Sequence, residues 1–402
     1  MTKCFFIANN NIGDFGLSGG DRIFIELARN WSKKIKLTIV GADEALKVCQ
    51  KEGLKDVNFL KTSSCLELKN VYSLSAILKN FVLKLTRGMR FVLKNKSIFS
   101  GDVIIYSVSD FYPDSLPALY IKFINPRAIW IASCFLFAPA PWSKDNPYRG
   151  LNFIRGILYW ISQKPIYWLI KCFSDFVFVT SEPDKKKFIT KSRDASKVVV
   201  IRGGVNTEAS DEYLNSHNFI PVSERKYDAC FVGRFHVQKG VLVLLDIWQE
   251  VIKSRPFARL AMIGNGSLEE MVRKQIKIKG LGDNIDLFGF LDGDKKFEIF
   301  KQSKIVVHPA TFDSGGMAAA EAMCWGLPAI SFDLEALKTY YPQGVVKVSM
   351  GDIKGFATAI TRLLTDKEFY EQIATQARYL IVHKWNWSNR AQEIYTCIMK
   401  EA

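Results

Sequence analysis

Short apolar segments recur along the chain, and each is followed by a loop and a helical pattern. In the first half they lie at residues 4–8, 35–40, 103–106, 128–131, 176–180 and 198–201. In the second half they lie at residues 228–232, 260–263, 285–288, 305–308 and 329–332. Strands that alternate with helices form a parallel sheet covered on both faces. We therefore predict an α/β protein with two Rossmann-like, doubly wound domains that face a central crevice, where ligands bind beyond the carboxyl ends of the strands.

The length of the chain supports two domains, because a single hydrophobic core stops growing at roughly 250–300 residues and this chain has 402. The glycine-containing segment 202–206 has the composition of a hinge. We expect a first domain at residues 1–202, a second at 203–380 and a C-terminal helix at 381–402.

Eight cysteines are scattered without a C-x-x-C pair, which is typical of free thiols in a reducing compartment. No basic-then-apolar leader opens the sequence, and no segment of about 18 residues is free of polar interruption. These features predict a cytoplasmic location and no membrane span.

The positive charge is concentrated in the first half. Residues 1–200 carry 30 Lys and Arg against 16 Asp and Glu, which accounts for almost all of the net charge of +15. Such asymmetry indicates an anionic partner for one domain. Because no recognition helix, zinc finger or aromatic RNA-binding motif is present, we expect no nucleic acid.

Segment 78–96 favours an anionic membrane surface as that partner. One helical stripe of apolar residues runs through it: Leu78, Val82, Leu85, Met89 and Val92. Basic residues accompany this stripe: Lys79, Lys84, Arg87, Arg90, Lys94 and Lys96. A basic amphipathic helix of this kind lies on anionic lipid, although an ordinary helix with a solvated basic face is the alternative. The aromatic and basic stretch 142–173 is a second such segment.

Three loops that follow strands of the second half carry the residues of a binding site. Arg234 and Lys239 lie in the glycine-bracketed loop 233–240, where an Arg can bind two oxygens and a Lys supplies a mobile charge. Gly264 lets the backbone approach a ligand. In the run 308–321, Asp313 and Glu321 flank a glycine-rich helix start that suits phosphate, and each can accept hydrogen bonds from hydroxyl pairs. A nucleoside diphosphate sugar would use all of these features.

These motifs resemble a known family. Asp313-x7-Glu321, followed by Ala322-Met323-x-x-Gly326-Leu327-Pro328, looks like the E-x7-E signature of the family-4 retaining glycosyltransferases with the GT-B fold. Gly233-Arg234-x4-Lys239-Gly240 is similar to the phosphate-binding Arg and Lys of that family. Weaker similarities are Gly19-Gly20, segments 175–181 and 201–206, and the Trp-rich C-terminal helix, which the resemblance implies returns to the N-terminal domain.

The resemblance implies a role for each site residue. Arg234 and Lys239 would hold the diphosphate and stabilise the leaving group, Asp313 would touch the donor sugar, and Glu321 would bind the ribose. The remaining expected contacts to the nucleotide sugar are Gly19, Gly20, Gly264, Gly315, Gly316 and Met317. The donor would be a UDP- or GDP-sugar, and the reaction would retain anomeric configuration without a metal or other cofactor. Asp292-Gly293-Asp294 resembles a metal-binding D-x-D, but it lies at a predicted helix start, where we expect Asp to cap.

One departure from the family leaves acceptor activation unassigned. Residues 1–200 contain no His, although the family often has one after a strand of this domain. Asp110 and Ser133 are our candidates on the acceptor side. The leading hypothesis is sugar transfer to a glycan or lipid-linked acceptor at the inner face of a membrane, in polysaccharide or glycolipid synthesis. A nucleotide-sugar epimerase and a non-catalytic sugar-nucleotide-binding protein are the alternatives.

Overall fold

The computed structural model describes residues 3–10, 18–54, 56–63, 74–143, 146–201, 203–313, 315–385 and 387–401. The chain divides into two compact units. Unit 1 comprises Met1–Pro141, Gly150–Ile201 and Ser388–Ala402, and unit 2 comprises Trp142–Arg149 and Arg202–Trp387.

Unit 1 contains a seven-stranded parallel sheet in the order β3-β2-β1-β4-β5-β6-β7. Its strands are β1 (Lys3–Ala8), β2 (Lys36–Ala42), β3 (Asn58–Ser63), β4 (Val103–Ser107), β5 (Ile129–Ser133), β6 (Phe176–Val179) and β7 (Val198–Val200). The central strands are uninterrupted apolar runs because helices cover both faces of a parallel sheet. Phe6 on β1, for example, is fully buried and packs against the rings of Trp31 and Tyr106.

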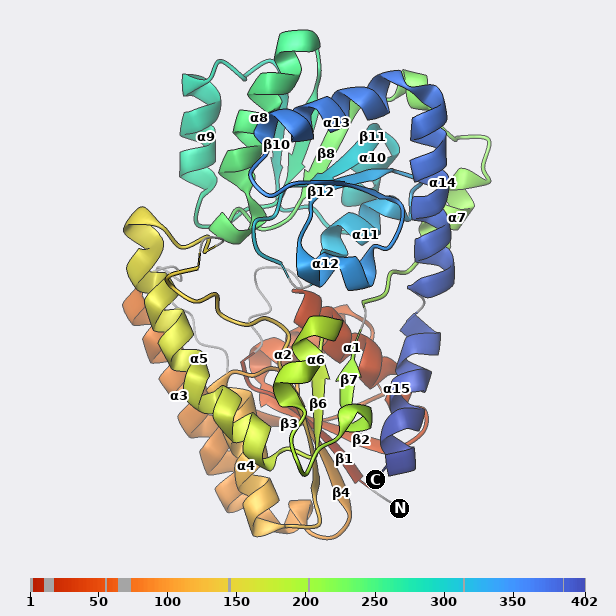
Figure 1. Ribbon diagram of the computed structural model, residues 1–402. Coiled ribbons are helices and arrows are strands. Elements are labelled where there is room, and N and C mark those ends of the chain that lie inside the picture. Colours follow the sequence, from red (N-terminus) through yellow and green to blue (C-terminus); the bar gives the residue numbers. More distant parts are fainter. Residues whose placement is uncertain are drawn as a thin grey trace. The chain divides into compact units, whose positions relative to one another are not determined.

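Within the described residues, seven α-helices surround this sheet. They are α1 (Gly19–Trp31), α2 (Asp43–Lys51), α3 (Leu74–Lys94), α4 (Tyr112–Ile124), α5 (Phe153–Phe173), α6 (Glu182–Phe188) and α15 (Trp387–Glu401). Helices α3, α4 and α5 are neighbours (Figure 1). The last helix belongs to unit 1 from Ser388 onward, where the indole N–H of Trp31 donates to the carbonyl oxygen of Ala391 at 3.0 Å.

Unit 2 contains a six-stranded parallel sheet in the order β10-β9-β8-β11-β12-β13. Its strands are β8 (Tyr227–Val232), β9 (Leu260–Ile263), β10 (Ile285–Gly289), β11 (Ser303–His308), β12 (Ala329–Phe332) and β13 (Val345–Val348). Its helices are α7 (Glu208–Leu214), α8 (Val241–Ser254), α9 (Glu269–Ile278), α10 (Asp294–Lys301), α11 (Met317–Met323), α12 (Glu335–Tyr340), α13 (Ile353–Thr365) and α14 (Lys367–Lys384). Helices α8 and α13 lie side by side over the core of this sheet (Figure 1).

Both strand orders are those of doubly wound Rossmann-like sheets, so the predicted α/β class with two doubly wound domains is confirmed. In each sheet the strand order reverses beside the first strand, between β1 and β4 in unit 1 and between β8 and β11 in unit 2. Ligands of such sheets bind beyond the carboxyl ends of the strands at this switch point. The site residues of the second half follow β8, β9 and β11, and they therefore lie at the expected edge.

The predicted basic face of segment 78–96 needs one correction. Lys84 is buried, and its ammonium lies 3.4 Å from the carboxylate of Glu44 on α2. Val92 is also buried, whereas Leu78 and Val82 are 62% and 48% exposed. Lys84 therefore faces the interior of unit 1, because α3 packs against the rest of the unit on the side that carries it. The outer side of α3 keeps an exposed apolar stretch near its N-terminal end.

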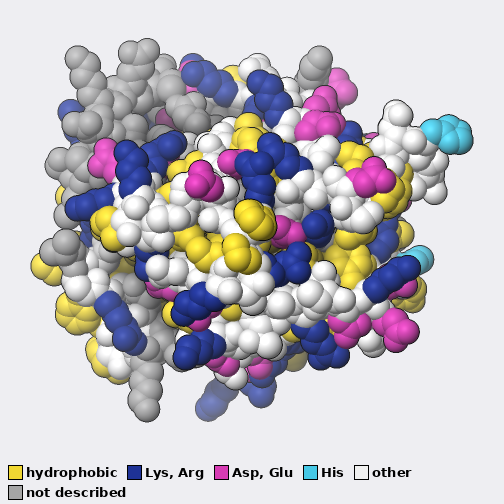
Figure 2. Space-filling view, turned by 90° about the horizontal axis from the view of Figure 1, so that it is seen from above, with side chains coloured by type: hydrophobic (Ala, Val, Ile, Leu, Met, Phe, Trp, Pro, Cys, Tyr) yellow, Lys and Arg dark blue, Asp and Glu magenta, His cyan; other side chains and the backbone are white. Residues whose placement is uncertain are grey.

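Five large apolar side chains of α5 are exposed: Phe153, Ile154, Leu158, Ile161 and Trp168. Lys164 and Lys171 lie over the rings of Trp160 and Tyr167 on the same helix. On the face of the molecule that Figure 2 shows, basic and acidic side chains are interspersed. Among the described residues, no helix combines the length and the apolarity that crossing a membrane would need.

Candidate functional site

The loops after β8 and β9 are joined by their backbones. The N–H of Gly233 donates to the carbonyl oxygen of Ile263, and that of Phe235 donates to Asn265. Gly264 has φ +140°, and a Cβ there would lie 1.9 Å from the carbonyl oxygen of Gly233. Only glycine permits this approach. The neighbouring loop therefore requires a glycine at position 264, and the contact of Gly264 with a ligand stays a prediction.

The loop after β11 is joined to the loop after β8 in the same way. The N–H groups of Thr311 and Phe312 donate to the carbonyl oxygen of Gln238 at 3.0 and 3.2 Å. Gln238 belongs to the short 3-10 helix Val237–Lys239, which ends at Gly240. These bonds bring together Lys239 and Asp313, whose Nζ and Oδ2 atoms lie 2.5 Å apart.

Asp313 is held in its charged form by its neighbours. Its side chain is 9% exposed, and its Oδ2 atom lies 3.0 Å from Nε2 of His308 as well as next to Lys239. Burial alone would raise the pKa of this carboxyl, but Lys239 and His308 outweigh it and keep the pKa well below its usual range. Asp313 and Lys239 therefore form a largely buried ion pair at the switch point of unit 2.

Arg234 differs from Lys239 in its surroundings. Its side chain is exposed, and it forms no ion pair within the described part of the chain. Tyr148 is close enough to sense its charge: burial raises the pKa of Tyr148 to about 12, and Arg234 opposes that rise. The Tyr148 ring also lies 6.1 Å from the ring of His236, the neighbour of Phe235. The guanidinium is therefore available to an anionic ligand.

The glycines after Asp313 are packed against aromatic rings. Gly316 has φ +58°, and its carbonyl oxygen accepts a hydrogen bond from the hydroxyl of Tyr341 at 2.6 Å. A Cβ on Gly315 would lie 3.2 Å from the ring of Tyr340. The side chain of Met317, the first residue of α11, lies against Gly203. Ser314, between Asp313 and Gly315, is outside the described residues.

Glu321 on α11 forms an ion pair with α10. Its Oε2 atom lies 2.8 Å from Nζ of Lys296, and Oδ1 of Asp292 lies 3.3 Å from the same nitrogen. Burial works against the charge of Lys296, but Glu321 and Asp292 outweigh it and raise its pKa. The Glu321 side chain remains 30% exposed, so part of the carboxylate is open to solvent or to a ligand.

The expected Asp cap at 292–294 is not formed. Gly293 occupies the N-cap of α10 without a side-chain cap, and Asp292 pairs with Lys296 instead. Across the described residues, no group of three or more His, Cys, Asp or Glu side chains is arranged to hold a metal ion.

The remaining candidates lie in unit 1. Gly19 and Gly20 form the first turn of α1, whose N-cap is Ser18, and Gly20 lies against the ring of Phe135. Ser133 is fully buried and its hydroxyl donates to the Tyr106 hydroxyl at 2.9 Å, a contact inside the sheet. Asp110 accepts a hydrogen bond from Gln163 at 2.7 Å, and burial raises its pKa to about 6.

Sequence reasoning missed Asp114, which lies in the same run as Asp110. It is fully buried and accepts hydrogen bonds from the backbone N–H of Asn9 and of Asn10, at 2.6 and 3.0 Å, and from the hydroxyl of Ser109. Burial raises its pKa to about 7 despite these bonds. Asp114 therefore fixes the end of β1 at the switch point of unit 1. Nothing in the sequence indicates the contact between His308 and Asp313 either.

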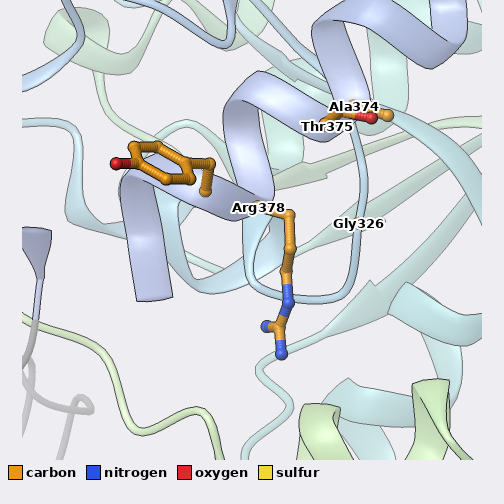
Figure 3. A pocket seen from close by; sticks show the side chains of 5 residues that line it. Gly326, Ala374, Thr375 and Arg378 are labelled. Carbon is orange, nitrogen blue, oxygen red and sulfur yellow. The ribbon is translucent and has the colours of Figure 1, made fainter. Parts of the chain in front are cut away.

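The surface pocket in Figure 3 lies away from these loops, between the end of α11 and α14. It is lined by Gly326, Ala374, Thr375, Arg378 and Tyr379. The guanidinium of Arg378 is bound by the hydroxyl of Ser210, the carboxylate of Asp211 and the carbonyl oxygen of Cys324. Because these partners come from α7 and the end of α11, Arg378 joins elements of unit 2 and offers no reactive group to the pocket.

Two doubly wound parallel sheets define the class of fold, which is that of the GT-B glycosyltransferases. The solved structure of Anabaena HepE in complex with UDP and glucose matches 99% of this chain and 100% of that chain, with a TM-score of 0.70 and 14% identity.

Residues 213–379, which contain Arg234, Lys239, Asp313 and Glu321, match the family model described as glycosyl transferases group 1. An uncharacterized glycosyltransferase of Methanocaldococcus jannaschii is 27% identical over 205 residues, 49% of this chain and 52% of the relative. The phosphatidyl-myo-inositol mannosyltransferase of Mycobacterium leprae is 30% identical over 171 residues, 41% of this chain and 44% of the relative. The chain thus spans about half the length of these relatives.

Proposed function

We propose that the protein is a retaining glycosyltransferase that moves a sugar from a UDP- or GDP-sugar to an acceptor glycan or lipid-linked sugar. The observation that carries this proposal is the gathering of Arg234, Lys239 and Glu321 on loops and a helix at the carboxyl ends of β8 and β11. These residues lie inside the segment that matches group 1 glycosyl transferases. A switch point with two cations and a partly exposed carboxylate suits a ligand that joins a diphosphate to a ribose.

The proposed chemistry assigns the leaving group to the two cations. Negative charge grows on the diphosphate as the bond to the anomeric carbon breaks, and preorganised cations stabilise that charge. Arg234 is exposed and free of ion pairs among the described residues, so it can bind two phosphate oxygens. Because Arg and Lys supply the positive charge, the proposed reaction needs no metal. Glu321 would accept hydrogen bonds from the ribose hydroxyls.

We place the acceptor with unit 1, at a membrane surface. The excess of basic residues lies in the first half of the chain, and exposed apolar side chains lie on α3 and α5. Exposed apolar side chains beside basic ones are typical of helices that lie on anionic lipid. The name of the Mycobacterium leprae relative refers to a lipid acceptor, which agrees with this assignment. Asp110 would contact the acceptor hydroxyl, since its raised pKa suits proton transfer.

Thermal unfolding with UDP, GDP and their sugar conjugates tests donor binding. A ligand that binds only the folded state stabilises it by about 2.7 kcal/mol at a hundredfold excess over its Kd. We expect the melting temperature to rise without added metal. Stabilisation that requires Mn²⁺ or Mg²⁺ would contradict the metal-independent reaction.

Product analysis then separates the possible activities. Incubation of the identified donor with a lipid extract gives a glycosylated lipid if the proposal is right. An isomerised donor would indicate an epimerase, and binding without turnover would indicate a sugar-nucleotide-binding protein.

A further inference from the structure

The carboxylate of Asp313 has two nitrogen neighbours on one oxygen. Nζ of Lys239 lies 2.5 Å and Nε2 of His308 lies 3.0 Å from Oδ2. The three side chains come from the short helix after β8, the end of β11 and the loop after β11. The side chains of Asp313 and His308 are 9% and 5% exposed, whereas that of Lys239 is 24% exposed. The outermost member of the cluster is therefore the lysine.

A carboxylate that binds sugar hydroxyls must offer its oxygens to the ligand. In Asp313, Oδ2 is shared by Lys239 and His308, and Oδ1 lies 3.4 Å from the backbone N–H of Gly315. Both oxygens thus lie next to protein groups, in a side chain that is almost completely buried. The carboxylate oxygens therefore contact protein groups, and little of their surface is open to the hydroxyls of a sugar.

Lys239, in turn, needs a partner that fixes its position. A lysine ammonium sits on a flexible four-carbon chain that loses rotamer entropy when it is fixed. The bond to Asp313 fixes it before any ligand arrives, and Nε2 of His308 lies 3.0 Å from the same carboxylate oxygen. A fixed cation stabilises developing charge without reorganisation during the reaction.

We propose that Asp313 and His308 are positioning residues, which hold the Lys239 ammonium for the donor diphosphate and do not contact the donor sugar. The inference rests on the proposed function for the identity of the ligand. It assigns a role to His308 and replaces the sugar contact that the family resemblance implies for Asp313.

Calorimetric titration of Asp313→Asn with UDP and with UDP-glucose, or with GDP and GDP-mannose, separates the two roles. If Asp313 positions Lys239, both ligands lose the same factor in affinity, about tenfold for one weakened charged hydrogen bond. Removal of a negative charge by itself would favour an anionic ligand, so a loss of affinity reports on position. In a Lys239→Ala background, Asp313→Asn should have no further effect on either ligand.

Variants of His308 provide a test that leaves the Lys239–Asp313 pair in place, in case Asp313→Asn does not fold. His308→Ala should weaken binding of the nucleoside diphosphate and of its sugar conjugate equally. His308→Gln, which retains an N–H donor, should recover most of the loss. An equal loss in the Ala and Gln variants would contradict the role assigned to His308.

Three outcomes would overturn the inference in distinguishable ways. Weaker binding of UDP-glucose by Asp313→Asn with unchanged binding of UDP would show that Asp313 contacts the sugar, and would leave the proposed function intact. Tighter binding of both ligands would show that Asp313 only repels the phosphate. If the wild-type protein binds none of the four probes, the proposed function fails together with the inference.

Discussion

The two cations of the candidate site should differ sharply in what their removal does to stability. Lys239→Ala leaves the Asp313 carboxylate, 9% exposed, without its closest cation. Removal of one partner of a fully buried ion pair costs about 3–5 kcal/mol. Because Lys239 is 24% exposed and His308 remains 3.0 Å from the carboxylate, we expect about 2–3 kcal/mol here. Arg234→Ala removes an exposed side chain, and should change the stability by less than about 0.5 kcal/mol.

Urea unfolding followed by tryptophan fluorescence measures both effects, because Trp248 and Trp325 are buried in unit 2. The pH dependence provides an independent check. The pKa of Asp313 is lowered in the folded protein, so its contribution is present above the ordinary pKa of about 3.9 and is lost as the pH falls through the lower folded value. Lys239→Ala should therefore lose less stability than the wild type on acidification. Equal stability of the Arg234 and Lys239 variants at neutral pH would refute the buried pair.

Four further results are expected. Gly264→Ala should prevent unit 2 from folding normally, because its Cβ would lie 1.9 Å from a backbone oxygen; circular dichroism that matches the wild type would contradict this. Burial raises the pKa of Asp114 to about 7, so its stabilising contribution is present below about pH 3.9 and is lost as the pH rises through 7; Asp114→Asn should flatten stability over that range in thermal melts. In initial-rate kinetics, Arg234→Ala should lower kcat about 10²–10³-fold, whereas Glu321→Gln should mainly raise KM, and a normal kcat in the former would exclude the leaving-group role. Replacement of Arg87, Arg90 and Lys94 on α3 by Gln should weaken binding to anionic vesicles by about 1 kcal/mol for each residue. Sedimentation with the vesicles measures this binding, and unchanged sedimentation would exclude this surface.

The interior strands of both sheets and the edge strands β7 and β10 could be predicted from sequence, whereas the edge strands β3 and β13 could not. Interior strands of a parallel sheet are buried on both faces, so they read as continuous apolar runs. β3 has the sequence Asn-Phe-Leu-Lys-Thr-Ser, and its residues are exposed or half-buried. β13 is likewise partly exposed along its length.

The orientation of α3 shows a second limit. A helical stripe identifies an amphipathic helix, but it does not indicate which basic residues bind partners inside the fold. Lys84 is at the correct spacing for the basic face, and only the position of Glu44 on α2 shows that it is buried in an ion pair. Sequence pattern could not supply this, because the two residues belong to different helices.

The residue types of the loop motifs were enough to predict that the second half of the chain binds an anion of the size of a diphosphate. The strand pattern was enough to predict that these motifs lie at one edge of a sheet. Only the tertiary structure shows which group each of these charges pairs with. Lys239 and Asp313 are far apart in sequence, and they meet because β8 and β11 are adjacent strands whose following loops share backbone hydrogen bonds. Strand order is a property of the whole sheet, so neither the pairing of these two charges nor the place of His308 beside them could be read from any local pattern.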